Sequence, residues 1–146
     1  MNLTYSEPEA ALQQAACLSR QLANRYRHAL EHLVEGRRLR AVVNQRAGEL
    51  EAQADTLDDW TRSRDLLPRD WHTEYSDLQA LADEVTGWLD DGQAHALSQR
   101  FAGEERELLA EMDTISGDDD LAAKVRPLRE ATCKAIETLD RGNTPP

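Results

Sequence analysis

Apolar residues recur at steps of three and four through most of the chain, which is the spacing that places them on one face of an α-helix. The clearest run lies at about 37–65, and its apolar positions are Leu39, Val43, Ala47, Leu50, Ala54 and Leu57. Similar runs predict helices at about 6–35, 93–115 and 118–141. Because such faces must be covered by other helices, the pattern predicts an all-α four-helix bundle, a single domain over residues 1–146 with an ordered core at about 6–141.

Local signals mark where these helices begin and end. Ser6 and Glu9 have the S-x-x-E spacing of a capping box, and Gly36 is placed to end the first helix in a left-handed conformation. Ser116 and Gly117 are expected to end the third helix. Pro127 lies inside the fourth apolar pattern, so that helix is either kinked at Pro127 or begins there.

The segment at about 66–91 predicts a crossover between the second and third helices. Pro68 disfavours helix in the residue before it, and an amphipathic pattern at about 73–90 predicts an extra short helix. A connection of this length returns the chain along the bundle, so the second and third helices are expected to be parallel. The tail at 142–146 is expected to be flexible.

Two glycines interrupt helical patterns. Gly48 and Gly103 lie in the middle of predicted helices, where a glycine costs about 1 kcal/mol relative to alanine. Either two helices approach closely at these positions, or the glycines lie on a solvated face, and the sequence leaves both readings open.

Charge and cysteine content narrow the range of partners and compartments. The formal net charge is −11, so binding to nucleic acid or to an anionic membrane surface is not expected. An acidic surface most simply serves solubility, and a basic protein partner is the second interpretation. The start of the chain lacks the apolar stretch of a secretory signal, and no run reaches the roughly 20 apolar residues of a membrane span. Cys17 and Cys133 form no CxxC motif, which fits free thiols in a cytoplasmic protein.

Glu105 is the most informative charged residue. It falls in the apolar seam of the third helix, between Phe101 and Leu108. A carboxylate there must be paired, hydrogen-bonded, protonated or bound to a metal ion. The interpretations are a buried or half-buried ion pair with Arg46 or Arg100, a metal ligand, or a seam edge that is open to water. An ion pair is favoured, and the matching places of Arg46 and Glu105 beside their stripes give the hypothesis that these two residues pair.

A second candidate metal site is the H-x-x-E-H spacing of His28, Glu31 and His32, which is that of inverted zinc peptidases. Two histidines four residues apart can bind zinc, with the glutamate as a base. The inward positions of this helix are Ala29 and Leu33, however, so the histidines are expected at the side of the stripe. Their simpler interpretation is a pair of flanking surface residues.

The chain resembles the small bacterial ferritin-like four-helix bundles, a family of uncharacterised function that is often linked to stress. The similarity covers about residues 22–139. It rests on Tyr26-x-x-Ala29, Leu39, Ala47-x-Glu49, Leu57, Pro68, Trp71, Gly103-Glu104-Glu105-x-x-Leu108, Met112 and Ile115. The resemblance implies the bundle with a long crossover between the second and third helices.

The di-metal site of ferritin-like proteins is incomplete in this sequence. Such sites take a glutamate from each of two helices and E-x-x-H from each of the other two. No histidine here is preceded by glutamate at three residues, and the expected ligand positions of the second helix fall on Glu49, Leu50 and Gln53. Glu49, Gln53 and Glu105 are therefore the only remnant candidates, and we expect no bound metal or other cofactor.

Function is the least determined property. The first expectation is a non-catalytic bundle that acts through protein–protein contacts as a homodimer. The alternative is a small acidic chaperone or adaptor for a secreted or assembly partner, in which the apolar stripes form an open binding surface. A metal-dependent oxidase with a reduced di-iron type site is a third, weaker interpretation.

Overall fold

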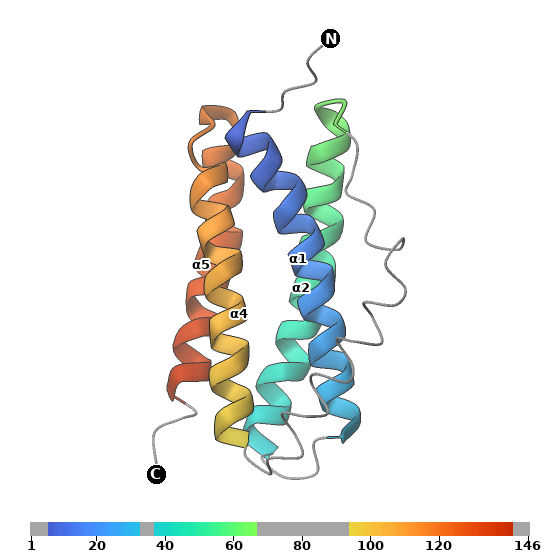
Figure 1. The fold of residues 1–146 in the computed structure, drawn as a ribbon, viewed down its shortest axis with the longest axis vertical. Helices are drawn as coiled ribbons and strands as arrows, with labels where there is room; N and C mark the ends of the chain where they lie inside the picture. Colours follow the sequence, from blue (N-terminus) through green and yellow to red (C-terminus); the bar gives the residue numbers. More distant parts are fainter. Residues whose placement is uncertain (1–5, 33–36, 67–93, 142–146) are drawn as a thin grey trace.

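A computed structural model describes residues 6–32, 37–66 and 94–141. The helices are α1 (Glu7–His32), α2 (Arg37–Ser63), α4 (Ala94–Ile115) and α5 (Asp119–Arg141), and no strand occurs in these ranges. The helices lie side by side as a bundle (Figure 1), which confirms the predicted all-α four-helix architecture.

The direction of the helices follows the predicted topology. α1 and α2 run antiparallel, α4 and α5 run antiparallel, and α2 and α4 point the same way (Figure 1). The parallel arrangement of α2 and α4 is the one predicted from the long connection. The predicted helix at 73–90, the turn at Gly36 and the tail at 142–146 lie outside the described residues.

The capping box predicted at the start of α1 is confirmed. The backbone N–H of Ser6 donates to Oε1 of Glu9 at 3.1 Å, and the backbone N–H of Glu9 donates to Oγ of Ser6 at 3.3 Å. The two side chains thereby satisfy backbone donors that a helix start leaves without an intrahelical partner.

α2 ends at Ser63, a little before the predicted boundary at 65. The backbone N–H of Leu66 donates to the carbonyl of Thr61, and that of Asp65 to the carbonyl of Arg62, both at 3.0 Å. This is the Schellman arrangement, in which the penultimate residue is left-handed, and Asp65 has φ 59°. This end was not apparent from the sequence because aspartate stands where glycine is usual.

α5 begins behind a single capping carboxylate. Oδ1 of Asp118 accepts the backbone N–H of Asp120 at 2.9 Å and that of Leu121 at 3.2 Å. The helix then continues through Pro127 to Arg141. The alternative that the last helix starts at Pro127 is therefore wrong.

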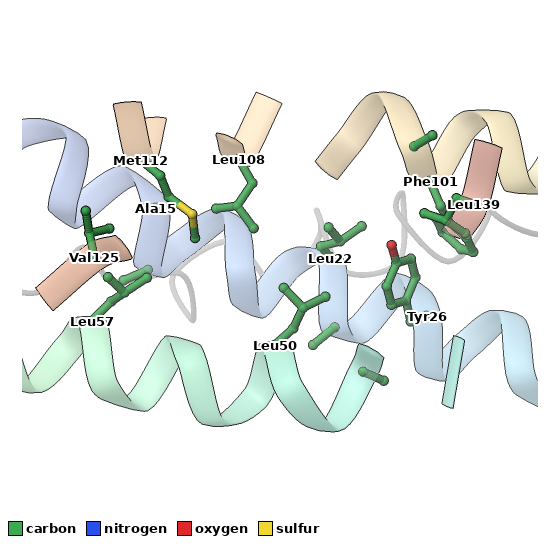
Figure 2. Packing of buried hydrophobic residues seen from close by; sticks show 14 of the residues in the cluster. Ala15, Leu22, Tyr26, Leu50, Leu57, Phe101, Leu108, Met112, Val125 and Leu139 are labelled. Atoms are coloured by element: carbon green, nitrogen blue, oxygen red, sulfur yellow. The ribbon is translucent and has the colours of Figure 1, made fainter. Parts of the chain in front are cut away.

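The apolar stripes close on one another and form a single core. Figure 2 shows Leu50, Leu57, Leu108, Met112 and Val125 inside the bundle, and each of these side chains is fully buried. Burying one such side chain contributes about 1.5–3 kcal/mol to folding. The stripes of the described helices are consequently packed against one another in the core.

The two glycines in the middle of helices, Gly48 and Gly103, lie on exposed faces of α2 and α4. A Cβ atom added at Gly48 or at Gly103 would meet nothing within 4 Å, and both glycines are exposed. The interpretation of close helix approach is therefore wrong, and the solvated face is right.

Cys17 is buried and Cys133 is half-buried, and both are free thiols, as predicted.

Candidate functional site

A buried polar cluster joins all four helices near the middle of the bundle. Its members are Tyr26 of α1, Arg46 of α2, Glu105 of α4 and Thr132 of α5. We call these residues the central cluster. Each lies among the inward apolar positions of its helix, so the same periodicity that builds the core also carries these polar groups into it.

The ion pair at the heart of the central cluster has fork geometry. Nε of Arg46 donates to Oε2 of Glu105 at 2.8 Å, and Nη2 donates to Oε1 at 2.9 Å. The Arg46 and Glu105 side chains are only 4% and 0% exposed. The predicted buried pair with Arg46 is confirmed, and the readings of Glu105 as a partner of Arg100 or as a water-exposed seam edge are wrong.

Three further hydrogen bonds connect this pair to its neighbours. The hydroxyl of Tyr26 donates to Oε2 of Glu105 at 2.7 Å. Nη2 of Arg46 also donates to Oγ1 of Thr132 at 3.1 Å, and Nη1 donates to Oε1 of Glu49 at 3.2 Å. Buried charges are tolerated when they are paired and hydrogen-bonded in this way, because the contacts offset the loss of hydration.

The Tyr26 ring is held by its apolar neighbours as well as by its hydroxyl. It packs against Phe101 in a T-shaped arrangement with the ring centroids 4.2 Å apart and an interplanar angle of 77°. Phe101 lies one turn before Glu105 on α4, so the same helix holds both the ring and the hydroxyl of Tyr26. This contact fixes the direction in which the hydroxyl donates.

The electrostatics of the central cluster fix its protonation. Burial raises the pKa of Tyr26 well above its ordinary value, and the charge of Glu105 raises it further. Burial acts to lower the pKa of Arg46, but the hydrogen bonds and charge of Glu105 outweigh it and raise the pKa. Tyr26 is therefore a neutral donor and Arg46 a permanent cation near neutral pH.

The remnant metal ligands do not converge. Glu49 is half-exposed and contacts the outer side of the Arg46 guanidinium. Gln53 is buried, but its Nε2 donates to Oγ of Ser19 at 3.0 Å, about 10 Å further along α2 than Arg46. Glu49 and Glu105 share one neighbour, the Arg46 guanidinium, while Gln53 belongs to a separate contact between α1 and α2.

A di-metal centre does not fit these residues. The Arg46 guanidinium lies between the Glu49 and Glu105 carboxylates, in the space that a metal ion bridging them would need. A fixed positive charge there repels a divalent cation, and it uses the carboxylate oxygens of Glu105 that would be ligands.

The histidine motif of α1 forms no ligand set in the described part of the chain. Nδ1 of His28 lies 3.8 Å from Oε2 of Glu31, and the Glu31 side chain is 71% exposed. The His32 side chain is outside what the structure describes. Among the residues that are described, no group of three or more histidine, cysteine, aspartate or glutamate side chains is placed to hold a metal ion.

Sequence reasoning did not assign Tyr26 and Thr132 to the site. Tyr26 entered the sequence analysis only as part of the Tyr26-x-x-Ala29 motif, and Thr132 received no interpretation there. The available signal was polarity: each is a hydrogen-bonding side chain at an inward position, which must find a buried partner. Only the packing of four helices could show that all partners meet at one ion pair.

A second arginine fork lies at one end of the bundle. Nη1 and Nη2 of Arg64 donate to Oδ2 and Oδ1 of Asp118 at 2.7 and 2.9 Å. Glu9 lies 3.7 Å from the same guanidinium. We call Arg64, Asp118 and Glu9 the end clamp, because they tie the end of α2 to the turn before α5 and to the first turn of α1.

The fold and the central cluster define a class: a four-helix bundle whose centre is closed by a buried arginine–glutamate pair. Comparison with protein-family models, with curated proteins and with solved structures finds no match to this chain. The ferritin-like resemblance consequently stays a prediction. Within the described ranges, no helix has the length and apolar character needed to cross a membrane.

Proposed function

We propose that this protein is a non-catalytic bundle of the ferritin-like kind, and that it works through protein–protein contacts as a homodimer. The observation that carries the proposal is the position of the Arg46 guanidinium between Glu49 and Glu105. Arginine there supplies internally the positive charge that the metal ions of a ferritin-like oxidase would supply. The bundle then needs no cofactor in order to fold.

The saturation of the interior supports the same proposal. The Glu105 carboxylate accepts hydrogen bonds from both Arg46 and Tyr26, so its oxygens are already engaged. A general base or nucleophile needs a free site beside a reacting atom. Because the Glu105 carboxylate is occupied by Arg46 and Tyr26, it is not available for catalysis. The outer surface of the bundle is then the part that can contact another protein.

Metal analysis is the first test of this proposal. Protein purified without an affinity tag is expected to carry well below one equivalent of iron, manganese or zinc per chain by elemental analysis. Its melting temperature should not change when EDTA is added, because Arg46 and not a metal compensates Glu105. One or two equivalents of metal, lost on chelation together with several degrees of melting temperature, would refute the proposal.

The oligomeric state is the second test. Size-exclusion chromatography with light scattering is expected to give twice the chain mass of 16.5 kDa. A pull-down from native lysate separates this from the adaptor alternative. An obligate stoichiometric complex with another protein, with no homodimer at any concentration, would contradict the proposal.

A further inference from the structure

A groove between α2 and α5 reaches the central cluster from outside. Its volume is about 340 Å³. The lining residues that matter here are Val42, Arg46 and Glu49 from α2 and Ala131, Lys134 and Ala135 from α5. The volume is near the lower end of the range for small-molecule sites, so a ligand of this groove is small.

The floor of the groove is the buried Arg46 guanidinium. Its Nε and Nη2 face inward and donate to Glu105 and Thr132, whereas Nη1 donates to Glu49 at the groove. Nη1 carries two N–H groups, and the contacts among the described residues use one of them. The groove thus ends on a buried, permanently charged donor that has capacity for a further acceptor.

Glu49 indicates what kind of acceptor fits. Its carboxylate contacts Nη1 of Arg46 at 3.2 Å, and its side chain is 44% exposed. Gln45 holds the other carboxylate oxygen at 3.3 Å, which is a long contact on the exposed side of α2. The half-exposed Glu49 side chain can rotate into water, and another carboxylate can then bind Nη1 of Arg46. The free-energy cost is small because exposed ion pairs contribute little.

The remaining lining selects for charge and shape. Val42, Ala131 and Ala135 give the groove an apolar wall, and Lys134 adds a second cation. The chain as a whole has a formal net charge of −11, which opposes each additional negative charge on a ligand. A single carboxylate on a short aliphatic chain satisfies the guanidinium, the apolar wall and the net charge together.

We propose that the groove between α2 and α5 binds a small aliphatic monocarboxylate. The ligand carboxylate replaces Glu49 on Nη1 of Arg46, and the aliphatic part lies against Val42, Ala131 and Ala135. This inference is independent of the oligomeric state and of the absence of catalysis proposed above.

The test is an NMR titration of the full-length protein with sodium hexanoate, with hexanamide and inorganic phosphate as the comparison ligands. Hexanoate is expected to cause saturable shifts confined to the amides around 42–49 and 131–138 and to the Nε–H of Arg46, with a Kd on the order of 1 mM. Hexanamide lacks the charge and phosphate lacks the aliphatic part, so neither should saturate in the same range.

Two variants and one control variant make the titration specific. Glu49→Gln removes the internal competitor and its negative charge, and it should tighten hexanoate binding about three- to tenfold. Ala131→Leu fills the groove from its half-buried wall and should abolish the shifts. Ala123→Leu adds the same side chain at an exposed position of α5 and should leave binding unchanged.

Several outcomes would overturn the proposal. These are the absence of saturable shifts, equal binding of hexanoate and phosphate, weaker binding by Glu49→Gln, or the same loss in Ala131→Leu and Ala123→Leu. A heteronuclear spectrum of each free variant shows that its fold is retained, so that a loss of binding reports on the groove.

Discussion

Two arginine–carboxylate forks with nearly the same hydrogen-bond lengths lie in different surroundings. In the central cluster the fork contacts are 2.8 and 2.9 Å, and in the end clamp they are 2.7 and 2.9 Å. The side chains of the Arg46–Glu105 pair are 4% and 0% exposed, whereas those of the Arg64–Asp118 pair are 22% and 21% exposed. The difference between the pairs is therefore one of hydration and not of hydrogen-bond length.

The difference in hydration determines which of the two pairs the fold depends on. Water can replace either partner of the end clamp, so loss of one side chain leaves the other solvated. Around Glu105 the partners are Arg46 and Tyr26 in the interior, and loss of one partner strands a charge. The same chemistry is consequently a modest tie at the bundle end and an obligatory pairing at its centre.

The largest effect is expected for removal of the Glu105 charge. Glu105→Gln leaves the Arg46 cation buried without a counter-charge, and we expect a loss of about 3–5 kcal/mol in the free energy of unfolding. Urea denaturation followed by far-UV circular dichroism measures it. The matched control is Asp118→Asn in the end clamp, which should lose clearly less. A cost of under about 1 kcal/mol for Glu105→Gln would show that the site is hydrated.

The next effect sharpens the role of the third partner. Tyr26→Phe removes the hydroxyl that donates to Glu105 but keeps the ring contact with Phe101. Because hydrogen bonds to charged groups are the stronger ones, we expect a loss of about 1.5–3 kcal/mol by the same denaturation method. An unchanged stability would mean that the Arg46 fork alone satisfies Glu105.

The central ion pair was predictable from the sequence, and its full set of partners was not. Glu105 interrupts an apolar stripe, so periodicity indicated a carboxylate that must be paired, hydrogen-bonded, protonated or bound to metal. Arg46 was the candidate partner at a matching place on α2, with Arg100 as the other candidate. Thr132 lies on α5, far from Arg46 and Glu105 in sequence. Its contact with Arg46 depends on how the two helix pairs pack, and no local pattern encodes that.

The helix ends also divide into those that the sequence predicts and those that depend on packing. The capping box at Ser6 and Glu9 was predictable because its hydrogen bonds are local in sequence. The end of α2 at Ser63 was placed slightly too late, because Asp65 adopts a left-handed conformation that sequence rules associate with glycine. The continuous helix through Pro127 was left open, because packing of α5 on the bundle can outweigh one lost backbone hydrogen bond.

Two glycines near the central cluster offer a test with the opposite sign. Gly48 lies two residues after Arg46 on α2, and Gly103 lies two residues before Glu105 on α4. Both glycines are on the exposed side of their helix. Nothing lies within 4 Å of an added Cβ, so Gly48→Ala and Gly103→Ala should each stabilise the protein by about 1 kcal/mol. Thermal unfolding of both variants checks this. A loss of stability would mean that these faces are covered in solution.

The smallest effect concerns the end clamp and appears only in acid. The hydrogen bonds from Arg64 hold the pKa of Asp118 below its ordinary value, and the backbone N–H of Leu121 adds to this. A depressed pKa stabilises the fold above the ordinary aspartate pKa of about 3.9, and that contribution is lost as the pH falls through the folded-state pKa. Asp118→Asn should therefore show a shallower loss of stability below about pH 4 than the parent protein. Identical acid profiles would show that the clamp is not populated.

The most direct test of the buried pair is a double-mutant cycle on Arg46 and Glu105. The stabilities of Arg46→Met, Glu105→Gln and the double variant are compared with the parent by urea denaturation. If the two residues act as one closed unit, the double variant should lose about 2 kcal/mol less than the sum of the single losses, since it leaves no stranded charge. Losses that add to within about 0.5 kcal/mol would contradict the account, because they would mean that Arg46 and Glu105 stabilise the bundle independently.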